Sequence, residues 1–125
     1  MKKIISTTHA PAAIGPYSQA VLAGGVLYLA GQIAIVPETG ELDLSNITAE
    51  TVQVMRNLEA VLLSAEMDFS NVVKCTIFLK DMSQYAEINA VYAQYFSDEP
   101  PAREAVQVSL LPKDVNVEIS LIAVV

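Results

Sequence analysis

The sequence predicts an α+β domain of two layers, in which two helices cover one face of a six-stranded mixed sheet. Short stretches rich in valine, isoleucine and leucine alternate with turn residues, and two longer segments repeat apolar side chains at helical spacing. Their order along the chain is βββαβαββ. A length of 125 residues has room for one domain, so we expect a single domain over residues 1–125.

The first three strands are predicted before a long loop. They are expected at residues 2–7, 18–23 and 26–30. Proline and glycine in residues 9–17 favour a loop between the first two strands. Gly24-Gly25 joins the second and third strands as a hairpin. A turn at residues 37–40 then opens a loop that continues to Asn46.

The first helix is predicted from Thr48 to about Glu66. Thr48 is expected to cap its start, and Glu50 lies in the first turn, where the helix dipole favours an acid. Apolar side chains then recur at helical spacing, at Val52, Met55, Leu58, Leu62 and Ala65.

The second half of the chain supplies a helix between three strands. Strands are expected at residues 72–79, 102–110 and 115–124. Ser83 is expected to cap the second helix, and Pro100-Pro101 to end it. Its apolar stripe consists of Tyr85, Ile88, Tyr92 and Phe96.

Alternation along the last two strands sorts their side chains onto two sheet faces. Arg103, Ala105, Gln107 and Ser109 share one face of the fifth strand, opposite Val106, Val108 and Leu110. Asn116, Glu118 and Ser120 share one face of the sixth, opposite Val117, Ile119 and Leu121. We expect both apolar sets to lie under the helices. Arg103 and Glu118 would then share the open face, which is either solvated or packed against another subunit.

Composition narrows the classes of function. Hydrophobic residues make up 53% of the chain and charged residues 17%, yet no apolar run is long enough to span a membrane. The surplus apolar surface therefore indicates a subunit interface. A net charge of −7 makes nucleic acid a poor partner. The start of the chain lacks the apolar core of a signal peptide, which favours a cytoplasmic location.

Two charged residues are the first candidates for a site. Arg103 can grip a carboxylate with its planar fork, although a structural salt bridge to Glu104 or Glu118 would also explain it. Glu118 can orient or deprotonate a water if its surroundings raise its pKa; otherwise it is a solvated strand carboxylate.

Three further residues are weaker candidates. Tyr17 can wall a pocket or simply pack at a loop–strand junction. Gly31 marks either a bulge or a close approach of a ligand to the backbone, and Asn89 is either a site residue or a solvated helix position. Cys75 and His9 are single residues of their kind, expected in the core and in solvent, so neither a disulfide nor a cysteine- or histidine-rich metal site is expected.

Several stretches together carry a family resemblance. They are APAAIGPYSQA at residues 10–20, AGQI at 30–33, VKCTIFLKDM at 73–82, INAVY at 88–92, and the closing pattern PAR, VQV, LPKD and VEI between Pro101 and Ile119. In these residues the chain resembles RidA-type members of the Rid (reactive intermediate deaminase) family over nearly its whole length. The resemblance implies a chorismate-mutase-like fold and a homotrimer with a central barrel and a site at each subunit cleft.

The same resemblance implies an activity without metal or cofactor. The substrates would be 2-aminoacrylate and 2-aminocrotonate, hydrolysed as their imine tautomers to 2-oxo acids and ammonia, after release from PLP-dependent serine and threonine dehydratases. Arg103 would bind the carboxylate, and Glu118 with the backbone near Ala105 would position water. Tyr17, Gly31 and Asn89 would complete the pocket.

Two departures from the family pattern keep other functions open. Many deaminases have serine and then cysteine or threonine where this chain has Glu104 and Ala105, and the loop at residues 97–100 is shorter than usual. A non-catalytic trimer that senses a 2-oxo acid or similar metabolite is therefore the main alternative. An RNA-cleaving or chaperone-like role is a second, but the acidic composition and the single His9 argue against ribonuclease chemistry.

Overall fold

A computed structural model describes residues 1–125, and it has the predicted order of elements. The strands are β1 (Lys3–Ile5), β2 (Ala20–Ala23), β3 (Val26–Gln32), β4 (Val72–Leu79), β5 (Ala102–Gln107) and β6 (Val117–Val124). The helices are α1 (Ile47–Ser64) and α2 (Tyr85–Ala93). Three short 3₁₀ turns accompany them, at Phe69–Asn71, Met82–Gln84 and Pro112–Asp114.

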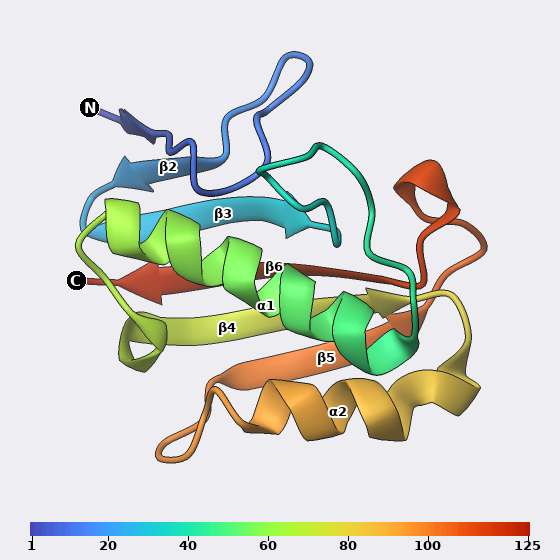
Figure 1. Cartoon of the computed structure of the whole chain (residues 1–125). Coiled ribbons are helices and arrows are strands. Elements are labelled where there is room, and N and C mark those ends of the chain that lie inside the picture. The colour runs from blue at the N-terminus through green and yellow to red at the C-terminus, as the bar shows by residue number, and fades with distance from the viewer.

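The six strands form one mixed sheet in the order β1-β2-β3-β6-β4-β5. Only β4 and β5 pair in parallel; the other neighbours are antiparallel. Both helices lie side by side over the same face of this sheet (Figure 1). The expected α+β class with two helices on one face is therefore confirmed.

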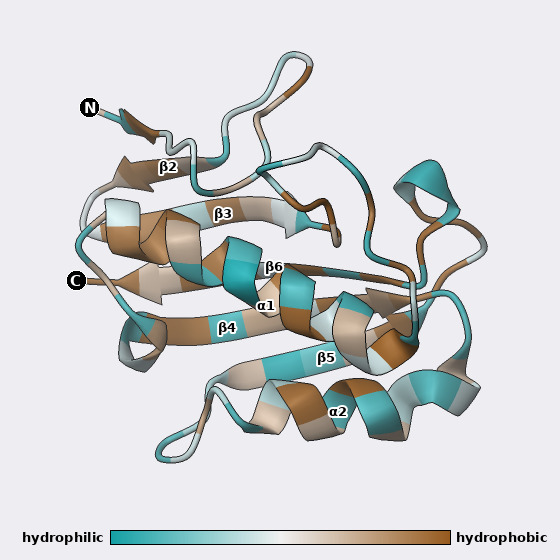
Figure 2. Cartoon of the chain, in the orientation of Figure 1, coloured by the Kyte–Doolittle hydropathy of each residue, from teal (hydrophilic) through white to brown (hydrophobic).

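The core lies between α1 and the central strands. Leu58 of α1, Ile77 of β4 and Ile119 of β6 are all fully buried. Hydrophobic colour covers most of β3, whereas β5 carries a hydrophilic stretch beside α2 (Figure 2). Removing a side chain of this size from such a core costs about 2–5 kcal/mol.

The start of α1 differs from the prediction. The capping residue is Asn46, whose side-chain oxygen accepts a hydrogen bond from Ala49 N at 2.8 Å, and not Thr48. The helix ends at Ser64, before Glu66, which takes a left-handed conformation with φ 60°. Asparagine is as good a cap as threonine, and the apolar pattern alone does not locate the first turn.

The start of α2 also differs. Asp81, not Ser83, accepts the capping hydrogen bond, and it caps a 3₁₀ turn that leads into the helix. The helix ends at Ala93, well before Pro100. The prolines therefore end the connection to β5 and not the helix.

Arg103 and Glu118 lie on opposite faces of the sheet, contrary to the expectation that they share the open face. Arg103 pairs in register with the buried Cys75 of β4, so its side chain points toward the helices. Glu118 pairs with Phe78, one of the residues that alternate outward from the core. The expectation failed on β5 because this edge strand meets the polar and aromatic side of α2. Its one valine, Val106, consequently faces outward.

No helix in the structure combines the length and apolar character needed to cross a membrane.

Candidate active site

The guanidinium of Arg103 is held under α2 by neutral groups. Nη1 donates to Asn89 Oδ1 at 2.6 Å, and Nη2 donates to the hydroxyl oxygen of Tyr85. The guanidinium carbon lies 5.5 Å from the centre of the Tyr85 ring and 4.9 Å from that of Tyr92, which are cation–π distances. Asn89 and Tyr85 are four residues apart and therefore project from the same side of the helix.

No acidic side chain neutralises Arg103. The two ion pairs of the chain are Lys74–Glu104 and Lys80–Asp114. Glu104 lies on the opposite sheet face, where its carboxylate also accepts a hydrogen bond from Thr76 Oγ1 at 2.8 Å. These contacts hold the pKa of Glu104 below its usual value, first through Thr76 and then through Lys74. The salt bridges proposed from sequence for Arg103 are therefore absent, and Glu104 does not compete for its guanidinium.

A hollow of about 470 Å³ opens beside Arg103. Its lining combines this cation with an amide and apolar side chains: Asn89, Tyr92, Ala93, Phe96, Pro100, Pro101 and Arg103. Ala105 follows Arg103 on the same face of β5, half-buried against the core. We refer to Arg103, Asn89 and the walls of this hollow as the cationic half-site.

The side chain of Glu118 lies directly against the backbone of Gly31. A β-carbon added to Gly31 would stand 2.1 Å from Glu118 Oε2, closer than any real contact. The strand pairing between β3 and β6 shifts between Leu29 and Gln32, which produces a bulge at this glycine. Burial raises the pKa of Glu118 above its usual value. Gly31 is thus required by the carboxylate itself.

A second hollow, of about 620 Å³, surrounds this carboxylate. Tyr17, Gly31, Lys113 and Glu118 line it together with mostly apolar residues of two loops. Tyr17 is exposed at the rim, with 55% of its surface accessible. We refer to these residues as the acidic half-site. The sequence predicted Tyr17, Gly31 and Glu118 as site residues, and the structure brings these three together.

Buried amides fix the two loops that line the acidic half-site. Gln19 Nε2 donates to the carbonyls of Thr7 and Pro11 at 3.0 and 2.7 Å, which fastens the loop before Tyr17. Asn57 Nδ2 donates to the carbonyls of Ile33 and Ile35 at 3.0 and 2.9 Å, which fastens the loop after β3. Both amides are almost fully buried, so losing either would leave carbonyls without partners.

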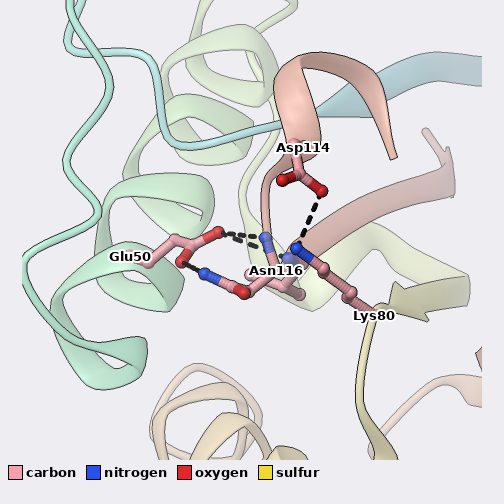
Figure 3. A network of polar contacts seen from close by, with 5 residues as sticks. Glu50, Lys80, Asp114 and Asn116 are labelled. Atoms are coloured by element: carbon pink, nitrogen blue, oxygen red, sulfur yellow. Dashed lines mark hydrogen bonds and ion pairs between the residues drawn. The ribbon is translucent and has the colours of Figure 1, made fainter. Parts of the chain in front are cut away.

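A buried carboxylate fixes the segment before Glu118. Glu50 accepts hydrogen bonds from Asn116 N at 2.8 Å and from Asn116 Nδ2 at 2.7 Å, and the two side chains meet between α1 and the start of β6 (Figure 3). Lys80 pairs with Asp114 at 2.7 Å in the same view. Glu50 therefore anchors a strand, where the sequence indicated a helix-dipole role.

Sequence reasoning missed Tyr85, Gln19 and Asn57. Tyr85 was placed only on the apolar stripe of its helix, although its position four residues before Asn89 puts both on one side. Asn57 lies three residues after the buried Val54 and is itself buried, so a polar residue inside the apolar stripe was the available signal. Gln19 gave no comparable signal. His9 is exposed and Cys75 buried, as expected.

Fold and site together define a small α+β protein with a cationic half-site on the helix face of its sheet and an acidic half-site on the open face. The two hollows share no lining residue. Within one chain, then, Arg103 and Glu118 do not form a common pocket.

A family model described as Endoribonuclease L-PSP matches residues 7–125. The chain is 46% identical over 124 residues to a mouse protein named 2-iminobutanoate/2-iminopropanoate deaminase, covering 99% of this chain and 92% of that protein. The crystal structure of YyfA from Yersinia pestis, described as a Rid family protein of unknown function, superposes with a TM-score of 0.96 at 46% identity and full coverage of both chains.

A second solved structure contains a bound amino acid. E. coli TdcF with bound serine superposes with a TM-score of 0.94 at 40% identity, covering 98% of each chain. The chain therefore belongs to the Rid family, whose model bears the endoribonuclease description, and the resemblance seen in the sequence is confirmed.

Proposed function

We propose that the protein hydrolyses 2-aminoacrylate and 2-aminocrotonate, in their imine forms, to 2-oxo acids and ammonia. The mouse relative bears the name of this activity. The structure of E. coli TdcF with bound serine supports the proposal, because serine is an amino acid of about the same size as these substrates and binds a protein of this fold. PLP-dependent serine and threonine dehydratases would supply such substrates, because they release enamines of this kind.

The observation that carries the proposal is the uncompensated charge of Arg103. A half-buried guanidinium surrounded by neutral oxygens and aromatic faces favours an anion from outside the chain. A carboxylate matches its planar fork through two parallel hydrogen bonds. The adjoining apolar hollow suits the short side chain of a 2-imino acid.

A homotrimer would bring the two half-sites together. Because Arg103 and Glu118 face opposite ways within one chain, a site that uses both needs a neighbouring copy. Tyr28 and Val106 leave 49% and 41% of their surfaces exposed on the open face, where another subunit would cover them. Three such faces would form the central barrel, with a site in each cleft, as expected from the sequence.

In this site Glu118 would act on water. Arg103 of one subunit holds the carboxylate, and Glu118 of the next takes a proton from the water that attacks the imine carbon. The new C–O bond gives a carbinolamine, and Glu118 passes its proton to the nitrogen. The C–N bond then breaks to release ammonia while the hydroxyl group gives its proton to the Glu118 carboxylate, which leaves the C=O bond of the 2-oxo acid. Burial, which raises the pKa of Glu118, makes it a better proton carrier at neutral pH.

The remaining residues of the two half-sites would shape this pocket. Gly31 leaves space for the carboxylate of Glu118 against the backbone, and Tyr17 closes the rim. Asn89 orients the guanidinium, and the backbone near Ala105 lies beside the bound substrate. Because a protonated imine is already electrophilic, binding it beside a positioned water needs neither a metal nor an organic cofactor.

The test couples a serine dehydratase to the protein and follows the rate of pyruvate release. Arg103→Ala should abolish the acceleration while the trimer persists. Arg56→Ala is the matched control, because it removes the same charge from an exposed position on α1. If Arg103→Ala keeps the parental activity, Arg103 does not bind the substrate carboxylate.

A second variant separates catalysis from binding. Glu118→Gln should lower turnover more than it weakens the binding of 2-oxobutanoate, since the amide cannot accept the proton. Equal turnover in Glu118→Gln and parent would remove the role of Glu118. A parent that binds 2-oxobutanoate but never accelerates pyruvate release would instead be a non-catalytic binder of 2-oxo acids.

A further inference from the structure

Arg103 keeps donors free after its contacts with α2. A guanidinium has five N–H groups in one plane. One goes to Asn89 Oδ1 and one to the hydroxyl oxygen of Tyr85. Three N–H groups are left for an anion, and the nitrogen bound to Tyr85, Nη2, still has one of them. An anion that uses this group will lie close to the Tyr85 hydroxyl.

The Tyr85 hydroxyl has a free donor of its own. In its contact with Arg103 it accepts a hydrogen bond, so its O–H proton is available, and it donates that proton to no residue of the chain. The side chain is half-buried at the first residue of α2. A proton in this position points to an acceptor that the chain itself does not supply.

The backbone holds Tyr85 firmly in this position. Asp81 caps the preceding 3₁₀ turn through Ser83 N at 2.9 Å. Met82 N donates to Gln107 Oε1 at 2.7 Å, which ties the same turn to the end of β5. The turn that leads into Tyr85 is therefore tied to the strand that carries Arg103.

We propose that the Tyr85 hydroxyl is a second donor of the anion site and binds the substrate carboxylate together with Arg103. A carboxylate offers two oxygens and about four acceptor positions, enough for the free Nη2–H and the phenol O–H at once. This inference rests on the proposed function, because it takes the Arg103 ligand to be a carboxylate. It adds a residue that determines how tightly carboxylate substrates bind.

Tyr95 provides the matched control. It is also a half-buried tyrosine, but its ring packs against Phe69, with 5.1 Å between the ring centres, and it lines neither hollow. Tyr85→Phe and Tyr95→Phe thus remove the same group from two half-buried rings, one beside Arg103 and one away from it. Only the first removes a donor beside the free N–H groups.

The experiment is a calorimetric titration of the purified protein with 2-oxobutanoate. Tyr85→Phe should raise Kd about tenfold, the size of a hydrogen bond to a charged group, whereas Tyr95→Phe should change it less than about twofold. In the dehydratase-coupled assay Tyr85→Phe should raise KM with little change in kcat, because the carboxylate keeps its charge throughout the reaction. Equal Kd values for the two variants would overturn the inference.

A structure of the complex with 2-oxobutanoate distinguishes contact from orientation. A carboxylate oxygen within about 3 Å of Tyr85 Oη supports direct binding, and a distance beyond about 4 Å overturns it. Binding that is lost in Arg103→Ala but unchanged in Tyr85→Phe refutes only the role of Tyr85. Failure of the parent to bind 2-oxobutanoate would refute the proposed carboxylate site, and the inference with it.

Discussion

Gly31→Ala should displace the carboxylate of Glu118 and so inactivate the protein. The added β-carbon would stand 2.1 Å from Glu118 Oε2 and 2.9 Å from its carboxyl carbon. To regain an ordinary contact of about 3.5 Å, the carboxylate must retreat by more than about 1 Å. A misplacement of that size costs about 10²-fold in rate, so kcat should fall by about that factor.

The fold itself should tolerate this change. Gly31 does not have a positive φ, so alanine fits the backbone, and rotation of Glu118 toward solvent relieves the clash. Gly40→Ala is the control: it strains a turn at φ +77°, but its β-carbon meets no atom within 4 Å. This control should lose about 1 kcal/mol of stability and keep its kcat. Rates from the coupled assay and urea midpoints measure both effects, and Gly31→Ala with parental kcat refutes the reasoning.

Three further predictions concern the site and its support. In a pH profile of kcat/KM, the fall on the acid side should lie above pH 4.5, because burial raises the pKa of Glu118 above that value. Glu118 acts as a carboxylate, so activity is lost as the pH falls through its raised pKa. A fall at or below pH 4.5 would contradict this. Glu104→Gln should change KM less than about twofold, since Glu104 faces away from Arg103; a tenfold rise would place it in the site. Asn57→Ala should cost about 1–3 kcal/mol in urea unfolding by freeing the Ile33 and Ile35 carbonyls, and an unchanged midpoint would show that water satisfies them.

The sequence was sufficient for the fold but not for the orientation of β5. Strand 72–79 and the central β6 follow the alternation rule because both are covered by the helix layer. On β5 the same rule misplaced Arg103, since an edge strand under the polar side of a helix can bury its polar face and expose its valine. Cap positions failed for a different reason: Asn46 and Asp81 each lie two residues before the expected caps, within the same polar segments.

The site was predictable residue by residue but not in its arrangement. Tyr17, Gly31 and Glu118 do share one hollow, and Arg103 and Asn89 share the other. That these are two separate half-sites depends on strand register, which local patterns do not encode. Glu104, by contrast, follows the alternation rule: it faces away from Arg103, and its hydrogen bond with Thr76 lies on the opposite face.

Mixing two inactive variants tests whether each active site combines Arg103 of one subunit with Glu118 of its neighbour. Arg103→Ala and Glu118→Gln, purified separately, are denatured together at equal amounts and refolded, and pyruvate release is measured against each variant alone. If each site takes its two halves independently from neighbouring subunits, activity should return to about one quarter of the parental level. Activity that stays at the background of the single variants would show that both residues serve one subunit, and would contradict the trimeric site.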